Sequence, residues 1–196
     1  MTESVEPRWD AELAVASADI IPFKQAVWRG HRRRYQPLDP SGSLRRSGRF
    51  HRATDQFPSN QTWPALYTAC DLATALGEIQ RSIVRQDDLI DMRFTEIWVE
   101  FDSVVDCRDL GALGLRFDDL FDDFDYGRGH ALALAALGRQ AEGLLVPSAT
   151  RLGANLIIFP HRQRSRSVLV EVRSIDPRLV KHARSPESAA SERTPS

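Results

Sequence analysis

Apolar residues recur along this chain with two different periods, which predict both strands and helices. Between residues 94 and 105, Ile97, Val99 and Phe101 alternate with polar side chains, as in a strand with one buried face. Further short apolar or β-branched runs predict strands at 26–29, 48–52, 64–69, 143–147, 155–160 and 168–174.

Two segments have a helical pattern. Asp71 stands where an N-cap is expected, and residues 130–140 are rich in Ala and Leu. After Asp71, four apolar residues recur on one helical face: Leu72, Leu76, Ile79 and Ile83. Many short strands with few helices indicate an α+β fold, in which the strands are mostly antiparallel, and not a regular βαβ array.

The pattern fades toward both ends of the 196-residue chain. Residues 1–20 begin with an acidic, weakly patterned stretch, and residues 181–196 are rich in Ser, Pro, Glu and Ala. We therefore expect one domain over residues 21–180, a partly disordered N-terminal tail and a disordered C-terminal tail. No apolar leader or membrane-length apolar run is visible, so we expect a cytoplasmic protein without membrane contact.

The net charge of −1 excludes a global field that would recruit nucleic acid, but the positive charge is clustered. Lysine occurs only at Lys24 and Lys181, and arginines gather at 29–34, 45–52 and 162–166. These clusters suit nucleic-acid contact, a clamp on the phosphates of a small nucleotide, or plain solvation. Because no Gly-rich phosphate loop is present, a nucleotide site would depend on side chains.

No residue pattern indicates a metal site. Cys70 and Cys107 lack ligand spacing, which favours two free thiols in a reducing compartment, and the five histidines are scattered. The acidic run at 118–127 fails as a calcium loop, because Gly127 and Leu134 stand where an oxygen ligand and a glutamate are needed. We therefore expect a solvated loop there and no bound metal.

Two polar residues, Glu78 and Ser148, remain ambiguous on the sequence pattern alone. Glu78 lies roughly 120° from the centre of the apolar helical face, beside Thr74 and Arg81. That position favours a surface carboxylate with Arg81 as an i,i+3 partner, worth a few tenths of a kcal/mol. Ser148 follows Leu-Val-Pro without the glycines of a hydrolase nucleophile elbow, which indicates a turn serine.

A set of short motifs in a fixed order adds a family resemblance. An early W-R, then G-R-F, ALYTA with ATALGE, EGLLVPSA and NLIIFP follow one another between residues 27 and 159. The set resembles the RES domain, a family of bacterial toxins of toxin–antitoxin pairs. The resemblance implies a compact core like that of ADP-ribosyltransferases and an activity on NAD.

The resemblance also implies the residues of a site. The implied catalytic residues are Arg29, Glu78 and Ser148. The implied substrate-binding residues are Arg49, Tyr67 and Asn155, to which we add Tyr35 in the first arginine cluster. The chain departs from the common family pattern at Phe50-His51 and has a longer loop after it, which affects local substrate contacts.

The chemistry suits these residue types. Breaking the bond between nicotinamide and ribose builds positive charge on the ribose, which Glu78 would stabilise. Arg29 or Arg49 would bind the pyrophosphate, and Tyr67 would offer an aromatic face to a base ring. Ser148 would hydrogen-bond the ribose or the carboxamide as a positioning group.

The resemblance thus implies a toxin that depletes NAD by hydrolysis or phosphorolysis, without a metal. Its expected partner is an antitoxin of the Xre/DUF2384 type that covers the active site, with nucleic-acid contact only through that partner, and a homodimer within the complex is possible. Two alternatives remain: an ADP-ribosyltransferase that modifies a protein or nucleic acid, and a non-enzymatic protein that binds RNA or a partner through its arginines.

Overall fold

The computed structural model describes residues 9–82 and 90–176. Within these residues the strands are β1 (Ile20–Arg32), β2 (Leu66–Ala69), β3 (Met92–Asp106), β4 (Gly143–Pro147), β5 (Ala154–Ile158) and β6 (Val168–Ile175). The α-helices are α1 (Ala11–Ser17), α2 (Leu72–Ser82), α3 (Phe117–Phe121) and α4 (Gly127–Gly138). Short 3₁₀ turns η1 (Ser41–Leu44), η2 (Ser59–Gln61) and η4 (Pro160–Arg162) lie in the connections.

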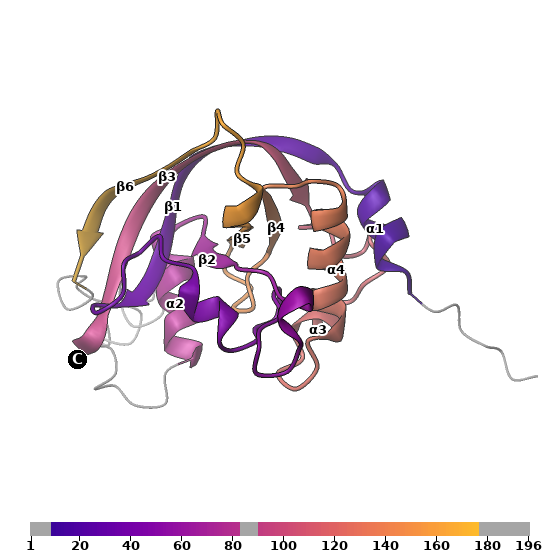
Figure 1. Ribbon diagram of the computed structural model, residues 1–196, viewed down its shortest axis with the longest axis horizontal. Helices are drawn as coiled ribbons and strands as arrows, with labels where there is room; N and C mark the ends of the chain where they lie inside the picture. Colours follow the sequence, from indigo (N-terminus) through magenta and orange to yellow (C-terminus); the bar gives the residue numbers. More distant parts are fainter. Residues whose placement is uncertain (1–8, 83–89, 177–196) are drawn as a thin grey trace, which may run out of the picture.

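The strands form one sheet that closes on itself. Its order is β1-β2-β5-β4-β3-β6, and β1 also pairs with β3, so five strands make a ring while β6 extends β3. The pairing of β3 with β4 is parallel and the other pairings are antiparallel. The α+β prediction with mostly antiparallel strands is therefore confirmed. Figure 1 shows β1, β3 and β6 arching over one side of the molecule.

β1 is much longer than the predicted strand at 26–29, whereas β3 nearly matches the prediction at 94–105. β1 and β3 pair along their lengths, from Ile20 opposite Val105 to Arg32 opposite Met92. The pattern at 26–29 misses the first part of β1 because Pro22 interrupts it. Pro22 falls where the register shifts between Ile21 and Phe23, a place where a strand tolerates a missing N–H donor.

The predicted strand at 48–52 is wrong, since this segment forms a tight turn. Gly48 and His51 exchange two backbone hydrogen bonds of 3.2 Å as an isolated bridge. A Cβ atom on Gly48 would lie 2.6 Å from the His51 ring and 2.9 Å from the Tyr67 hydroxyl. The turn therefore needs glycine for close packing, and its chemistry overrides the short apolar pattern.

The prediction that residues 1–20 form a tail outside the fold is wrong from residue 9 onward. Asp10 caps α1 by accepting hydrogen bonds from the N–H groups of Glu12 and Leu13. Ala14 and Val15 of this helix are buried in the core cluster to which α4 also contributes. A seven-residue helix is too short to display a clear apolar period, which explains the miss. The predicted tail at 181–196 lies outside the described residues.

Helix α2 packs against the sheet, but its most buried residues are not the predicted ones. Leu72, Leu76 and Ile79 are partly buried against the cluster that contains Trp28 and Phe94. The fully packed positions are instead Thr74 and Ala75, and Ile83 lies outside the described residues. The helix thus contacts protein on two sides, so the face that carries Thr74 and Glu78 is turned inward.

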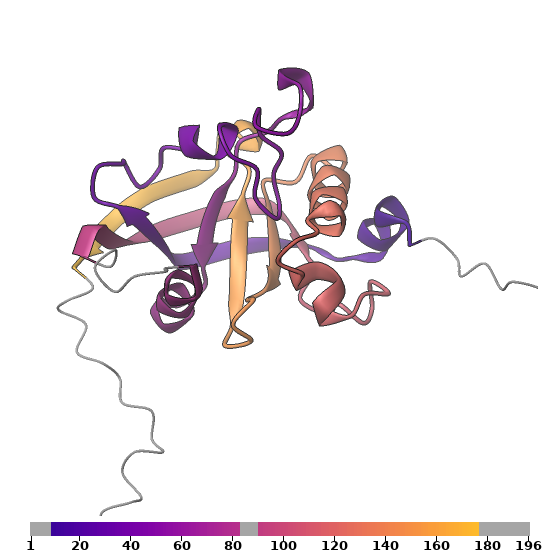
Figure 2. The same cartoon turned by 90° about the horizontal axis from the view of Figure 1, so that it is seen from below.

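The site region is formed where α2 approaches β1. A Cβ atom on Gly30 would lie 2.6 Å from Cγ1 of Ile79, so only glycine allows this contact without movement of α2. The predicted N-cap is confirmed, because Asp71 accepts hydrogen bonds from the backbone N–H and the hydroxyl of Thr74. Figure 2 shows α2 on one side of β2 and β5, with α3 and α4 on the other side. Across the described segments, no helix combines the length and apolar character needed to cross a bilayer.

Candidate active site

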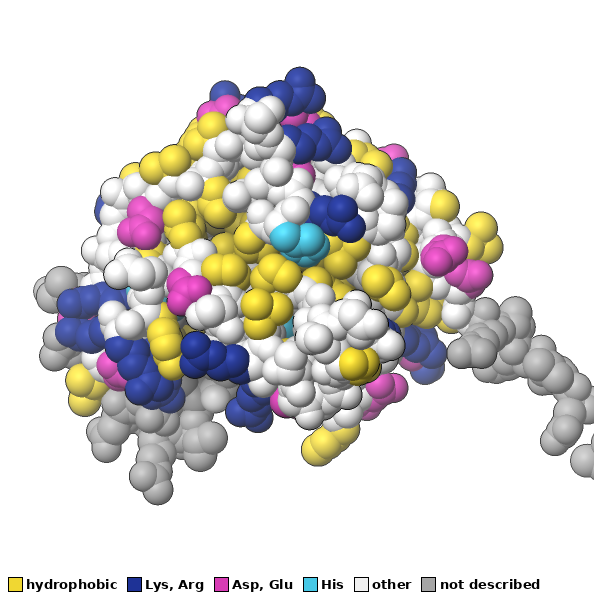
Figure 3. All heavy atoms as spheres, in the orientation of Figure 1, with side chains coloured by type: hydrophobic (Ala, Val, Ile, Leu, Met, Phe, Trp, Pro, Cys, Tyr) yellow, Lys and Arg dark blue, Asp and Glu magenta, His cyan; other side chains and the backbone are white. Residues whose placement is uncertain are grey.

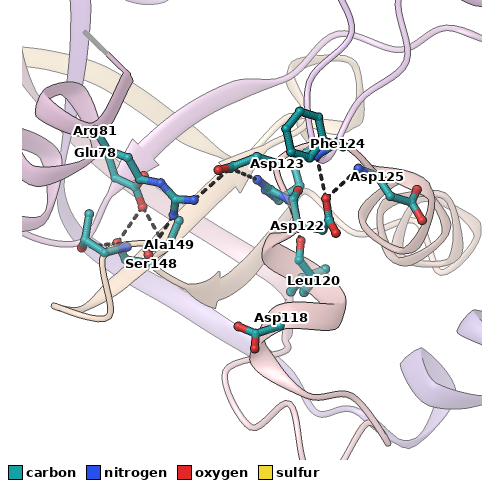
Figure 4. Close-up of polar contacts among 12 residues, drawn as sticks. Glu78, Arg81, Asp118, Leu120, Asp122, Asp123, Phe124, Asp125, Ser148 and Ala149 are labelled. Carbon is teal, nitrogen blue, oxygen red and sulfur yellow. Dashed lines mark hydrogen bonds and ion pairs between the residues drawn. The ribbon is translucent and has the colours of Figure 1, made fainter. Parts of the chain in front are cut away.

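Glu78 is the centre of a hydrogen-bonded group that joins α2 to the strands. Its Oε1 atom accepts hydrogen bonds from Ser148 Oγ at 2.6 Å, from Ala149 N at 2.9 Å and from Asn155 Nδ2 at 2.7 Å. Figure 4 shows the Ser148 and Ala149 contacts beside the carboxylate. Among the described residues, all three hydrogen bonds go to one oxygen, so Oε2 is left for a ligand.

A cavity of about 120 Å³ lies against Glu78. Its walls come from β1, β2, β5 and α2. Apolar and aromatic side chains form one part of the lining: Trp28, Tyr67, Ala69, Ala75 and Ile79. Glu78 and Asn155 also line it, so a charged group and an amide stand at the edge of an aromatic-walled space.

Asn155, which lines this cavity, carries an unused acceptor. Because a carboxylate accepts hydrogen bonds, the atom of Asn155 that contacts Glu78 is the amide nitrogen. The amide oxygen Oδ1 is then buried, with no hydrogen-bond partner in the part of the chain that the structure describes. Buried polar atoms are rarely left unpaired, so this oxygen is suited to accept a hydrogen bond from a ligand.

Ser148 lies behind Glu78 and does not line the cavity. It is fully buried, and its hydroxyl donates to Glu78. Thr150 supplies the remaining contacts, with Oγ1 at 2.6 Å and its N–H at 3.1 Å from Ser148 Oγ. Since the single Ser148 proton goes to Glu78, Thr150 is the donor in both contacts. The predicted contact of Ser148 with ribose or carboxamide therefore needs correction, because the serine positions Glu78 instead.

Tyr67 keeps its ring available while its hydroxyl is occupied. The residue is 36% exposed and lines the cavity. Its hydroxyl oxygen accepts a hydrogen bond from Phe50 N at 2.8 Å and lies 2.9 Å from Nδ1 of His51. Burial of the hydroxyl raises the pKa of Tyr67 well above its ordinary value. An aromatic face, and not the hydroxyl, is what this residue offers to a ligand.

His51, where the chain departs from the common family pattern, holds that hydroxyl. Its Nε2 lies 2.8 Å from the carbonyl oxygen of Arg46, which can only accept, so Nε2 carries the proton. Nδ1 is then the acceptor, and the Tyr67 hydroxyl donates to it. Burial lowers the pKa of His51 below its ordinary value, in keeping with a neutral ring.

Besides Ser148, three of the predicted residues do not line the cavity: Arg29, Tyr35 and Arg49. Arg29 donates to the carbonyl oxygens of Pro37 at 2.6 Å and of Asp39 at 3.4 Å, and burial lowers its pKa to about 10. Its neighbours Trp28 and Gly30 line the cavity, so strand alternation directs Arg29 to the other face. Tyr35 is 42% exposed, with the guanidinium of Arg34 at 4.9 Å from its ring.

Arg49 anchors the acidic segment that follows α3. It donates to the carbonyl oxygens of Leu120 at 2.8 Å and Asp122 at 2.5 Å, and its guanidinium lies 5.0 Å from the ring centre of Tyr126. Leu120 and Phe121 are buried, so the predicted solvated loop is wrong for these residues. Arg81 lies 2.8 Å from the carboxylate of Asp123 (Figure 4), and Arg49 lies 3.6 Å from the same carboxylate. Arg81 therefore pairs with Asp123, not with Glu78 as its spacing suggested.

The first arginine cluster is a paired surface. Lys and Arg side chains gather at the end of the molecule where β1 ends, whereas the middle of the same face is largely apolar (Figure 3). Arg32 pairs with Asp91 at 3.5 Å, and Arg33 and Arg93 pair with Asp176 at 2.7 and 2.8 Å. These acidic partners offset the positive charge that the sequence places there.

The two cysteines do not line the cavity. Cys70 and Cys107 are free, as predicted, and burial raises the pKa of Cys70 to about 11 and that of Cys107 to about 12. No group of three or more His, Cys, Asp or Glu side chains within the described ranges is placed to hold a metal ion.

Several residues of the site were missed from the sequence. Trp28 and Gly30 flank Arg29 at the two-residue period of a strand, which was the available signal for their shared face. Arg81 follows Glu78 at helical i,i+3 spacing, so its position beside the site could also have been inferred. The role of Asp123 had no signal, because a loop brings it to the site.

The fold and the site together define an α+β protein with a carboxylate at a small, aromatic-walled cavity. A family model described as the RES domain matches residues 26–180, and the chain belongs to this family. A comparison with curated proteins finds no match. Among solved structures, the fold is similar to a chain of the M. tuberculosis MbcT–MbcA toxin–antitoxin complex. That likeness has a TM-score of 0.73 at 24% identity, over 86% of this chain and 93% of the other.

Proposed function

We propose that this chain is the toxin of a toxin–antitoxin system and cleaves the nicotinamide–ribose bond of NAD⁺ in the cytoplasm. The observation that carries the proposal is the arrangement around Glu78. One carboxylate oxygen is fixed by three donors, the other is left over, and Asn155, which lines the same cavity, has a buried acceptor without a partner among the described residues. Membership of the RES domain family supports an activity on NAD.

The size of the cavity suits one ring of the substrate. Pockets that hold whole ligands measure about 300–1,000 Å³, so a space of about 120 Å³ takes only a part of NAD⁺. The nicotinamide ring would lie against Trp28 and Tyr67, whose rings line the space. Asn155 Oδ1 would accept a hydrogen bond from the carboxamide or from a ribose hydroxyl, which gives this buried oxygen its missing partner.

The reaction needs a group that stabilises positive charge. As the C1′–N bond breaks, its electron pair leaves with nicotinamide, which becomes neutral, and the ribose gains oxocarbenium character. Glu78 lies at the edge of the cavity, where its free oxygen would stabilise that charge and orient a ribose hydroxyl. Water or phosphate then adds to C1′ through an oxygen and gives ADP-ribose, with loss of a proton, or its 1′-phosphate.

Nicotinamide release by the purified full-length protein tests this function. NAD⁺ would be supplied with and without phosphate, and the products identified by mass. We expect Glu78→Gln, which keeps the size but removes the charge, to lower kcat about 100- to 1,000-fold. Full activity in that variant would overturn the site. No release from NAD⁺ under either condition would overturn the function, and ADP-ribose adducts on macromolecules would indicate a transferase instead.

An inhibitory partner fits this proposal. The M. tuberculosis structure with a similar fold is a toxin–antitoxin complex, which supports the expectation of an antitoxin. We propose an Xre/DUF2384-like protein that covers the cavity beside Glu78 and blocks entry of NAD⁺. Co-expression should restore growth and prevent nicotinamide release, whereas an antitoxin that binds without reducing release would contradict coverage of the cavity.

A further inference from the structure

The carboxylate of Asp123 bridges two arginines beside Glu78. Arg81 Nη2 lies 2.8 Å from the Oδ1 atom of Asp123 (Figure 4), and Arg49 Nη2 lies 3.6 Å from the same atom. The two guanidinium groups are therefore neighbours, and the positive charge of Arg81 contributes to the lowered pKa of Arg49, after burial. Two like charges held around one acceptor oxygen form a candidate anion-binding site for an anion with several oxygens.

This anion-binding site adjoins the hydrogen-bonded residues around Glu78. Arg81 stands three residues after Glu78 on α2, so the two side chains lie on neighbouring positions of the helix surface. Arg81 Nη1 donates to the carbonyl oxygen of Ala149 at 3.0 Å, and the N–H of the same residue donates to Glu78. One residue of the β4–β5 turn thus ties the carboxylate to the guanidinium.

The arginines are fixed, whereas their acidic partner is exposed. The Arg49 side chain is only 13% exposed and is held by two backbone carbonyl oxygens. The Asp123 side chain is 64% exposed, and its contacts in the described segments are with the two arginines. Its neighbour Asp122 is used differently, since its carboxylate accepts from the backbone N–H groups of Phe124 and Asp125. A stronger anion can therefore replace Asp123 without breaking the loop.

We infer that Arg81 and Arg49 bind the phosphoryl groups of the substrate, and that Asp123 occupies this place in the free protein. The inference rests on the proposed NAD⁺ cleavage and adds to it a residue, Arg81, and a competing carboxylate. Binding of the pyrophosphate displaces Asp123, because bidentate contacts from two guanidinium groups to phosphate oxygens exceed those to one exposed carboxylate. The acidic segment is then a built-in competitor for the substrate.

Calorimetry tests the anion-binding site without catalysis. It measures the binding of inorganic pyrophosphate and of ADP-ribose to the full-length protein. Asp123→Asn should bind about two- to fivefold more tightly, because the competing charge is gone. Arg81→Gln should bind about tenfold more weakly. Asp118→Asn and Arg128→Gln are matched controls and should bind like the native protein. Asp118 is an exposed aspartate of the same segment, and Arg128 has a side chain as exposed as Arg81, 40% against 39%.

Two substrates that share the scissile bond separate phosphate binding from chemistry. NAD⁺ has a pyrophosphate and nicotinamide riboside has none, so Arg81→Gln should raise KM for NAD⁺ about tenfold and leave KM for the riboside unchanged. An equal effect on both substrates, or Asp123→Asn behaving like Asp118→Asn, would overturn the inference while NAD⁺ cleavage stands. If the variants show the predicted affinities for pyrophosphate but no nicotinamide is released, the proposed function is overturned and the anion-binding site stands.

Discussion

At each end of β4 a glutamate carboxylate accepts a hydrogen bond from a serine, yet the two sites differ in which glutamate oxygens are left unused. Before the strand, Glu142 is fully buried and both of its oxygens are occupied. Oε2 accepts from the N–H groups of Asp102 and Ser103, and Oε1 accepts from Ser167 Oγ and Arg164 N. After the strand, Ser148 and Ala149 donate to Glu78 of α2. With Asn155, they give three hydrogen bonds to one oxygen of Glu78, which lines a cavity.

The difference shows how a structural carboxylate is told from a chemical one in this fold. Both glutamates accept several hydrogen bonds, so hydrogen bonding alone does not separate them. The unused capacity does: in the described part of the chain both oxygens of Glu142 accept hydrogen bonds, whereas Glu78 keeps one oxygen unused and lines a cavity. Glu142 thus ties the 164–167 segment to β3, and Glu78 is available for a ligand.

The largest expected effect is the loss of stability when Glu142 is removed. Glu142→Ala leaves buried N–H groups without an acceptor and should lower the free energy of unfolding by about 4 kcal/mol. Glu78→Ala should lower it by only about 1 kcal/mol, because water in the cavity can replace the lost contacts. Urea unfolding of both variants measures the contrast, and equal losses would show that the two ends of β4 do not differ in this way.

A smaller effect is expected from the two serines, which serve as matched probes. Ser148→Ala removes one support of Glu78 and should lower kcat for nicotinamide release about tenfold, with KM within about twofold, because it does not line the cavity. Ser167→Ala removes the equivalent support of Glu142 and should change stability but not kcat. A Ser148 variant that alters KM alone would instead mean that the serine contacts the substrate.

The same contrast separates the ring of Tyr67 from its hydroxyl. Tyr67→Phe removes the hydroxyl that links Phe50 N and His51, and should lower the free energy of unfolding by about 1 kcal/mol. KM for NAD⁺ should stay within about twofold, because the aromatic face remains. Tyr67→Leu is the control that removes the aromatic face, and it should raise KM about fivefold. A large KM change in the Phe variant would assign the hydroxyl to the substrate.

The smallest effect concerns pH. Burial holds the pKa of His51 below the ordinary value of about 6.5, so the folded state disfavours the protonated ring. The neutral ring's contribution is complete above about pH 6.5 and is lost as the pH falls below that value. Native protein should lose stability between pH 7.5 and 5.5, and His51→Gln should lose about 1 kcal/mol less over that range. The other buried histidines titrate in both proteins, so equal losses would show that His51 is not the group responsible.

Much of the fold was accessible from the sequence because its signals are local. The alternation in β3, the Asp71 cap of α2 and the apolar runs of β4 and β5 depend on neighbouring residues. The helical wheel failed at Glu78 for a physical reason. A helical wheel assumes that a helix packs against one surface, whereas α2 lies between the sheet and the β4–β5 turn. A Cβ atom on Gly77 would lie 3.2 Å from Cγ2 of Thr150 in that turn.

The site was predicted in part. Motif order placed Glu78, Tyr67 and Asn155 in one site, and the structure brings all three to one cavity, while their roles toward a substrate stay predictions. Arg29 was misplaced because its direction depends on the extent and register of β1, which the interrupted pattern around Pro22 concealed. Asp123 comes from a loop whose path depends on the carbonyl contacts of Arg49, and no periodic pattern encodes such contacts.

The ring of strands is closed by one residue pair, Trp28 opposite Ala69, while its other neighbours share three or more pairs. Both residues of this closing pair line the cavity. The two residues that close the sheet therefore also form part of the cavity wall. A substitution that reshapes the pocket here also alters the seam, so substrate preference at this wall cannot vary independently of the integrity of the barrel.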